Sequence, residues 1–268
     1  MRLIMLGTGH AMVTRCYNTC FALEDGDEYF LVDAGGGNGI LCQLEKAKID
    51  WRKIKTIFVT HKHIDHLLGV LWLIRRLGQK MLRGEYEEEV TIYGCDGVTD
   101  TLDEMVRLLL PQKICSFLGE QIHLVTVKDG ETKQILGHEV TFFDIHSTKE
   151  KQFGFTLFYD EAGQKKLTCL GDEPFHICNG KYVKKSTWLM HEAFCLYEER
   201  EEFEPYEKSH STVKEACEMA QEYEIPNLIL YHTEDKNIER RKERYTREGE
   251  LFYQGKLYIP EDLETIRL

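Results

Sequence analysis

Apolar runs alternate with short polar turns along the first half of the chain and predict a series of strands and helices. The predicted strands cover residues 3–6, 20–23, 29–32, 57–59 and 90–94. The predicted helices cover residues 40–46, 67–74 and 99–110. Pro111 ends the last of these helices, because proline cannot continue an α-helix. The second and third strands flank Glu24-Asp25-Gly26-Asp27, so we expect them to form a hairpin.

Polar side chains follow four of the five strands predicted in the second half. These strands cover residues 139–145, 153–159, 166–170, 187–190 and 227–231. His146, Asp172, the His191-Glu192 pair and His232 come at the ends of four of them. Because ligands bind at the ends of strands in α/β proteins, we expect these side chains to meet at one rim of a sheet.

His210 lies just before a predicted helix. Thr212 and Glu215 have the T-x-x-E spacing of a capping box, which predicts that a helix begins there. The backbone N–H groups at such a helix end favour an anion such as phosphate. The preceding residues 197–208 are rich in glutamate, and we expect a solvated surface loop there.

Thr60-His61-Lys62-His63-Ile64-Asp65-His66 is the densest group of candidate ligands in the chain, and it separates a predicted strand from a predicted helix. Imidazole and carboxylate groups are ligands that suit borderline divalent metals such as Zn²⁺. His61 and His63, two apart in extended backbone, point to the same side and can bind one ion. Asp65 and His66 stand at the turn into the helix and can reach a second ion.

Asp33 ends the third predicted strand, directly before a run of three glycines, Gly35-Gly36-Gly37. Two roles are open for it: N-cap of the helix over residues 40–46, or support for the metal site. The glycines allow close approach of the backbone to a ligand or another loop. A Walker-type phosphate loop is excluded, because no Lys-Ser or Lys-Thr pair follows.

Net charge, the length of the apolar runs and the cysteine pattern exclude several classes of protein. The 268 residues carry a formal net charge of -12, which argues against a protein that coats nucleic acid with a basic surface. No apolar run approaches the roughly 20 residues that cross a bilayer, and the apolar start breaks at Gly7-Thr8-Gly9, so we expect neither a membrane span nor a signal peptide. Nine cysteines without a CxxC pair fit a reduced, cytoplasmic protein.

No linker is evident, and we expect one domain over residues 1–268.

The H-x-H-x-D-H motif at His61–His66, followed by isolated His, Asp and His residues, resembles the metallo-β-lactamase superfamily. Within it the chain is most similar to ribonuclease Z, the endonuclease that trims the 3′ end of precursor tRNA. The likeness rests on Gly7-Thr8-Gly9, on the triplets 191–193 and 210–212, and on His232 after an Ile-Leu-Tyr strand. The resemblance implies an α/β fold of four layers, the αββα metallo-β-lactamase sandwich, and it suggests a homodimer.

The resemblance also implies the roles of the candidate residues. One metal ion would be held by His61, His63 and His146, the other by Asp65, His66 and His232, with Asp172 bridging both. Zn²⁺ is the expected metal, and Mn²⁺ or Fe²⁺ would accept the same ligands. Asp65 would also orient the attacking water, while His210 protonates the leaving oxygen and Glu192 orients His210.

The expected activity is therefore a dinuclear metal-dependent phosphodiesterase that acts on RNA, such as precursor tRNA, or on smaller phosphodiesters. Only 26 residues separate His146 from Asp172, where ribonuclease Z usually has an arm that clasps tRNA. An armless relative is thus included in the expectation. The alternatives are a hydrolase of carboxylic ester, thioester or lactam substrates, and a non-catalytic binding or redox module. The Glu192/His210 pair separates the phosphodiesterase from the hydrolase of carbonyl substrates, because only leaving-group protonation beside a phosphate requires it.

Overall fold

The structure is a computed structural model that describes residues 1–160 and 162–268. The chain divides into two compact units, each built around one seven-stranded mixed sheet. The first unit comprises Met1–Gly7, Tyr17–Lys128 and Asp262–Leu268, and the second comprises Thr8–Cys16 and Asp129–Glu261. Within the described residues, no helix is both long enough and apolar enough to cross a membrane.

The sheet of the first unit combines an antiparallel half with a parallel half. In spatial order its strands are β14 (Thr265–Arg267), β1 (Arg2–Gly7), β2 (Cys20–Asp25), β3 (Glu28–Val32), β4 (Ile54–Phe58), β5 (Val90–Gly94) and β6 (Ile122–Thr126). The strands β2 and β3 pair as the predicted hairpin, and from β3 to β6 all neighbours are parallel. Parallel neighbours need crossover connections, and helices supply them here.

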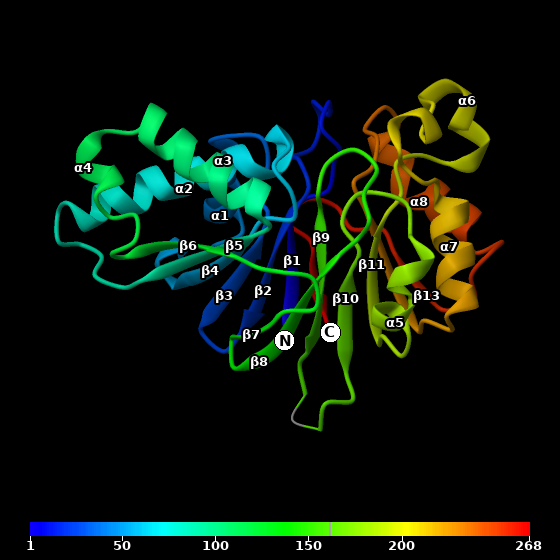
Figure 1. The fold of residues 1–268 in the computed structure, drawn as a ribbon. Coiled ribbons are helices and arrows are strands. Elements are labelled where there is room, and N and C mark those ends of the chain that lie inside the picture. Colours follow the sequence, from blue (N-terminus) through cyan, green and yellow to red (C-terminus); the bar gives the residue numbers. More distant parts are fainter. Residues whose placement is uncertain (161) are drawn as a thin grey trace. The chain divides into compact units, whose positions relative to one another are not determined.

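Helices gather on one face of this sheet (Figure 1). They are α1 (Gly39–Lys46), α2 (Ile64–Met81), α3 (Asp96–Leu109) and α4 (Gln112–Cys115), with a short 3-10 turn η1 (Trp51–Lys53). The longest, α2, follows β4, begins within the histidine-rich motif and buries an apolar stripe from Leu67 to Met81. The helix predicted over residues 99–110 is α3, and it ends before Pro111 as expected.

The second unit repeats the mixed design. In spatial order its strands are β13 (Lys256–Tyr258), β12 (Asn227–Tyr231), β11 (Trp188–Glu192), β10 (Lys166–Cys169), β9 (Phe153–Phe158), β8 (His138–Asp144) and β7 (Thr132–Ile135). The strands from β10 to β13 are parallel, and those from β10 to β7 are antiparallel. The five strands predicted in this half are all present. The described residues between His146 and Asp172 contain only β9 and β10, which agrees with the absence of an arm expected there.

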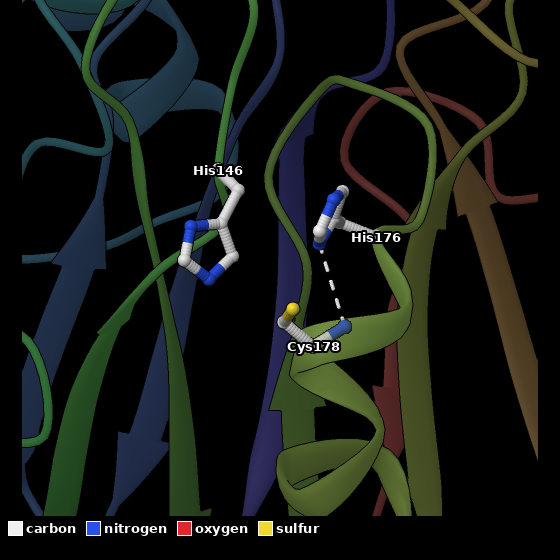
Figure 2. Close-up of side chains that lie close together, drawn as sticks. All are labelled: His146, His176 and Cys178. Carbon is white, nitrogen blue, oxygen red and sulfur yellow. Dashed lines mark hydrogen bonds between the residues drawn. The ribbon is translucent and has the colours of Figure 1, made fainter.

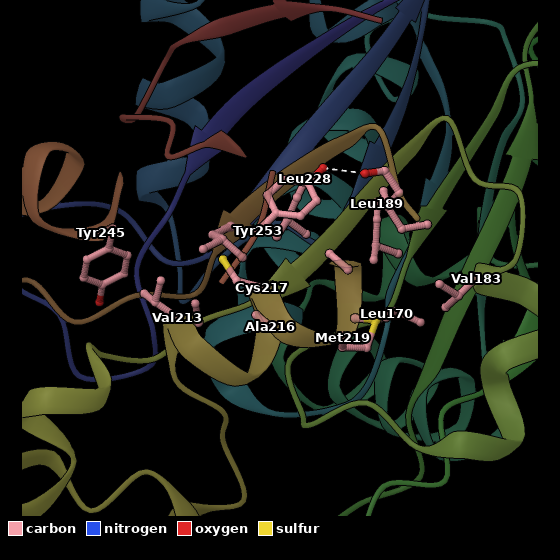
Figure 3. Close-up of a cluster of buried hydrophobic side chains, with 14 of the residues drawn as sticks. Leu170, Val183, Leu189, Val213, Ala216, Cys217, Met219, Leu228, Tyr245 and Tyr253 are labelled. Atoms are coloured by element: carbon pink, nitrogen blue, oxygen red, sulfur yellow. Dashed lines mark hydrogen bonds between the residues drawn. The ribbon is translucent and has the colours of Figure 1, made fainter. Parts of the chain in front are cut away.

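Helices α7 (Val213–Glu222) and α8 (Ile238–Gly249) cover this sheet, together with α5 (Gly180–Val183) and its preceding turn η2 (Ile177–Asn179). Their apolar side chains form a buried core with β11 and β12, in which Cys217 and Leu228 are fully buried (Figure 3). Tyr253 closes this core and donates a hydrogen bond to the carbonyl oxygen of Ile225 at 2.7 Å. The capping box predicted at Thr212 and Glu215 is confirmed at the start of α7.

The segment of residues 197–208, expected to be a solvated surface loop, is only partly solvated. The segment contains short helical turns, η3 (Tyr197–Glu199), α6 (Arg200–Phe203) and η4 (Tyr206–Lys208). Charged side chains of the segment have partners: Arg200 lies over the ring of Tyr197 at 4.1 Å, and Arg244 of α8 contacts Glu199 at 2.7 Å. The glutamates are thus not all solvated, which the composition alone could not show.

Candidate metal centre

The first group of predicted ligands lies on the connection from β4 to α2. Thr60 is fixed at its start, because its backbone N–H donates to Asp33 Oδ1 at 2.8 Å. His61 Nε2 and His63 Nδ1 are 2.7 Å apart, and the two rings meet edge to face with centroids 4.4 Å apart. The predicted convergence of these two imidazoles is therefore present within the first unit.

Asp65 and His66 lie in the first turn of α2. His63 is the N-cap of this helix, with an extended backbone at ψ 151, so the chain turns sharply between the two ligand pairs. Asp65 Oδ2 and His66 Nε2 are 3.3 Å apart, and both side chains are buried. The rings of His61 and His66 are 4.2 Å apart, so all four ligands of the motif gather around one region.

Asp33 supports this group and is not a helix cap. Its carboxylate accepts hydrogen bonds from Thr60 Oγ1 at 2.9 Å and from His66 Nδ1 at 2.7 Å, whereas Asn38 is the N-cap of α1. Since a carboxylate accepts, His66 Nδ1 carries the proton, so Nε2, which lies 3.3 Å from Asp65 Oδ2, is the nitrogen with the lone pair that a metal ion would use. Burial raises the pKa of Asp33, and the contacts with His66 and Thr60 oppose that rise.

A close approach of α2 to the loop after β3 holds Asp33 against His66. Gly69 N–H donates to the carbonyl oxygen of Gly35 at 2.8 Å, and Ala34 N–H donates to that of His66 at 3.0 Å. A Cβ at Gly69 would stand 1.8 Å from the carbonyl oxygen of Ala34. Sequence reasoning did not select Gly69, although a glycine early in an apolar helix is a signal of close packing.

In the second unit, Asp172 and His232 come together after β10 and β12. His232 Nε2 and Asp172 Oδ2 are 3.4 Å apart, and both residues are buried. Gln152 holds the other carboxylate oxygen, since its Nε2 donates to Asp172 Oδ1 at 2.5 Å. Gln152 itself is 1% exposed, and no sequence pattern marked it.

Three of the predicted site residues have left-handed backbone. Asp33, His146 and His232 have φ of 55°, 62° and 58°. Such conformations cost roughly 1–3 kcal/mol for residues other than glycine and cluster at functional sites, where the surrounding structure fixes them. All three follow the end of a strand, so the strain aims the side chain away from the strand direction.

Glu192 and His210 also meet, as predicted. Glu192 is fully buried, its Oε1 accepts from Ser211 Oγ at 2.6 Å, and its Oε2 lies 3.7 Å from His210 Nδ1. The His210 ring stacks on Phe194 with centroids 4.8 Å apart and lies 5.3 Å from the ring of His232. Burial lowers the pKa of His210 to about 4 and raises that of Glu192, so both groups favour their neutral forms before a ligand arrives.

His146 is the one predicted ligand that is exposed. Its ligand atoms lie within 4.8 Å of those of His176 and Cys178, two residues that sequence reasoning did not select (Figure 2). The rings of His146 and His176 have centroids 5.0 Å apart. Ligation of a shared ion by His146 together with His61 and His63 stays a prediction.

The donor set fits divalent metal ions within each unit. Tetrahedral Zn²⁺ with ligand distances of 2.0–2.1 Å places neighbouring ligand atoms roughly 3.3 Å apart. The Asp65–His66 pair at 3.3 Å and the Asp172–His232 pair at 3.4 Å match this spacing, and the His61–His63 pair at 2.7 Å needs only a small opening. Asp33 and Gln152 supply the outer hydrogen bonds that orient such ligands.

Comparison with known proteins identifies the family. Ribonuclease Z of Thermococcus sibiricus is 27% identical over 312 residues, covering 100% of this chain and 96% of the relative. The metallo-β-lactamase fold protein YhfI of Bacillus subtilis superposes with a TM-score of 0.79 at 16% identity, covering 99% of this chain and 98% of that one. The short form of human tRNase Z gives a TM-score of 0.75 at 21% identity over 100% and 99% of the two chains.

These likenesses confirm the predicted metallo-β-lactamase fold and the resemblance to ribonuclease Z. A family model described as anti-Pycsar protein Apyc1 matches residues 1–258, nearly the whole chain. The chain therefore belongs to the family of the anti-Pycsar protein Apyc1.

Proposed function

We propose that this protein is a dinuclear metal-dependent phosphodiesterase that hydrolyses RNA, such as precursor tRNA, or smaller phosphodiesters. The observation that carries the proposal is the set of buried ligand pairs with metal-ligand spacing, Asp65 with His66 and Asp172 with His232. The similarity to ribonuclease Z of Thermococcus sibiricus along the whole chain supports it.

The ligand assignment rests on the sequence resemblance. Zn²⁺ is the metal that the imidazole and carboxylate donors suit best, and Mn²⁺ or Fe²⁺ would accept them too. In the proposed set, His61, His63 and His146 would hold one ion, Asp65, His66 and His232 would hold the other, and Asp172 would serve as a ligand as well.

The chain's own residues orient the reactants and move protons. When bound, two divalent ions polarise a phosphoryl oxygen and lower the pKa of a bound water. Asp65 orients the attacking water and accepts its proton. His210 donates a proton to the departing oxygen, and Glu192, held by Ser211, fixes the orientation of the His210 ring.

The electrostatics of the His210 site favour an anionic substrate. Burial disfavours the imidazolium of His210 before substrate binds, as its lowered pKa shows. A phosphodiester anion beside the ring favours the charged form, because an opposite charge within about 4–6 Å raises the pKa of an imidazole. Binding of the substrate would thereby favour the protonated form of His210, which then donates its proton to the leaving oxygen.

The substrate class is narrowed by two features. The described residues between β9 and β10 leave no arm of the kind expected for clasping tRNA, and the net charge of -12 disfavours a large polyanion. Both features favour a small phosphodiester over precursor tRNA. On the resemblance alone we also propose a homodimer in the cytoplasm, and the nine free cysteines are compatible with a reduced compartment.

A substrate panel tests the function. The full chain, loaded with Zn²⁺ or Mn²⁺, is assayed on precursor tRNA, cyclic nucleotides, bis(p-nitrophenyl) phosphate and a thioester. We expect metal-dependent hydrolysis of at least one phosphodiester and none of the thioester. Turnover of the thioester alone would replace the phosphodiesterase by the carboxylic-ester alternative.

A further inference from the structure

We propose that the buried carboxylate of Glu173 positions Lys149 beside His210, where the ammonium group of Lys149 binds the phosphate group of the substrate. Glu173 is in this view a positioning residue, and Lys149 is the residue that touches the substrate. All three residues lie within the second unit. The inference rests on the proposed function, because it concerns the binding of a phosphodiester anion.

Glu173 directly follows Asp172, and only 5% of its surface is exposed. Burial of a carboxylate is costly unless hydrogen bonds satisfy its oxygens. Oε1 of Glu173 accepts a hydrogen bond from the Ser147 hydroxyl at 2.6 Å, and Oε2 accepts one from the backbone N–H of Thr148 at 3.0 Å. Both oxygens therefore hold the loop that follows β8.

Ser147 connects this carboxylate to Lys149. While the Ser147 hydroxyl donates to Glu173, its oxygen accepts the backbone N–H groups of Lys149 and Glu150, each at 3.2 Å. Serine side chains fix tight turns by such local hydrogen bonds. The backbone of Lys149 is thus held in place, although the residue itself is exposed.

A second contact places this turn beside His210. The hydroxyl oxygens of Thr148 and Ser209 are 3.2 Å apart. Lys149 follows the first of these residues in the chain, and His210 follows the second. Burial is the main reason for the lowered pKa of His210, and the positive charge of Lys149 contributes to it. Lys149 therefore lies within electrostatic reach of the proposed proton donor.

The ammonium group of Lys149 suits a phosphate oxygen. It offers three N–H donors and a compact positive charge at the end of a flexible stem. The net charge of -12 disfavours the approach of an anion to this chain. A lysine at the edge of the site offsets that repulsion locally, and salt weakens the effect because the group is exposed.

Calorimetric titration of the zinc-loaded full chain with inorganic phosphate tests this arrangement without turnover. Lys149→Met should weaken phosphate binding about fivefold at low salt, and by less at high salt. Glu173→Ala and Ser147→Ala should each weaken it about two- to fivefold, because Lys149 loses its fixed position. The matched control is Glu218→Ala, which removes an exposed carboxylate of α7 and should leave phosphate binding unchanged.

Double variants separate positioning from a general structural role. If Glu173 acts through Lys149, Glu173→Ala should change phosphate binding by less than about 1.5-fold once Lys149→Met is present. Two factors that simply multiply in the double variant would overturn the proposal, and so would unchanged binding in Glu173→Ala. Ser147→Ala leaves the buried carboxylate in place and gives the same comparison if Glu173→Ala does not fold.

Trypsin cleavage after Lys149 and Lys151 measures how firmly the turn is held. Loss of the hydrogen bonds to Glu173 in Glu173→Ala should speed this cleavage about tenfold, whereas Glu218→Ala should leave it unchanged. Cleavage that is no faster in Glu173→Ala would overturn the role of Glu173. A chain that binds phosphate as expected but hydrolyses no phosphodiester would contradict the proposed function alone, because neither measurement depends on turnover.

Discussion

Replacing Gly69 by alanine tests how the first ligand group is held. The added Cβ would stand 1.8 Å from the Ala34 carbonyl oxygen and 2.6 Å from its carbon, both backbone atoms. Ordinary contacts need well over 3 Å, so α2 must move away from the loop after β3. That movement breaks the hydrogen bonds that Gly69 and Ala34 make across the contact.

The expected size of the effect follows from opposing contributions. Alanine in place of glycine stabilises a helix by about 1 kcal/mol. Overpacking costs about 1–3 kcal/mol, and each of the two lost hydrogen bonds about 0.5–1.5 kcal/mol. We therefore expect Gly69→Ala to lower the free energy of unfolding by about 1–5 kcal/mol, and to weaken metal binding because His66 moves relative to Asp33.

Urea unfolding of the full chain, with metal removed by a chelator, measures this loss as a lower transition midpoint. Gly78→Ala in the same helix is the matched control. The three atoms nearest to its Cβ would all belong to the side chain of Ile114, the closest at 2.5 Å, so we expect a smaller loss than in Gly69→Ala, at most about 2 kcal/mol. Equal stability of Gly69→Ala and the wild-type chain would refute the account of this contact.

Three further substitutions address the second unit. Gln152→Leu removes the hydrogen bond to Asp172, and we expect metal binding about 10–100-fold weaker by chelator competition; unchanged affinity would deny Gln152 its supporting role. His210→Ala should lower turnover of bis(p-nitrophenyl) phosphate about 10²–10⁴-fold while metal content stays intact, with His123→Ala as the control outside the site. Burial is the main cause of the raised pKa of Glu192 and of the lowered pKa of His210, and the positive charge of Lys149 acts to lower both pKa values. Lys149→Met should therefore raise KM for an anionic substrate by about fivefold at low salt, and by less at high salt; a KM ratio independent of salt would contradict this.

The sequence predicted those parts of the molecule whose patterns are local. Apolar runs marked the central strands, and the polar residues at their ends marked the candidate ligands, because a buried strand and the polar residues that follow it differ sharply in composition. The pairing of Glu192 with His210 followed from resemblance, and the structure places them 3.7 Å apart.

Local sequence patterns do not predict contacts between segments that are distant in the chain. Gln152 reaches Asp172 across 20 positions of sequence from a loop without periodicity. The helix α8 was not predicted, because it is mostly charged and buries only Arg241, Tyr245 and Gly249. Arg241 is buried since its guanidinium donates to Thr233 Oγ1 at 2.6 Å, a partner that only the fold supplies.

The alternatives for Asp33 show the same limit. The position of Asp33 before a helix is compatible with an N-cap as well as with support for the metal site. Only the fold shows that the carboxylate of Asp33 accepts a hydrogen bond from His66. His146 is the converse case, where the motif suggested one set of partners and the structure places His176 and Cys178 beside it.

The metal content of the purified full chain tests the central claim most directly. It is measured with and without the substitution Asp172→Ala. We predict about two equivalents of zinc per chain with Asp172 present, as a dinuclear site requires, and a sharp fall in the Asp172→Ala variant. One equivalent or none with Asp172 present, or an unchanged content without it, would contradict the dinuclear centre.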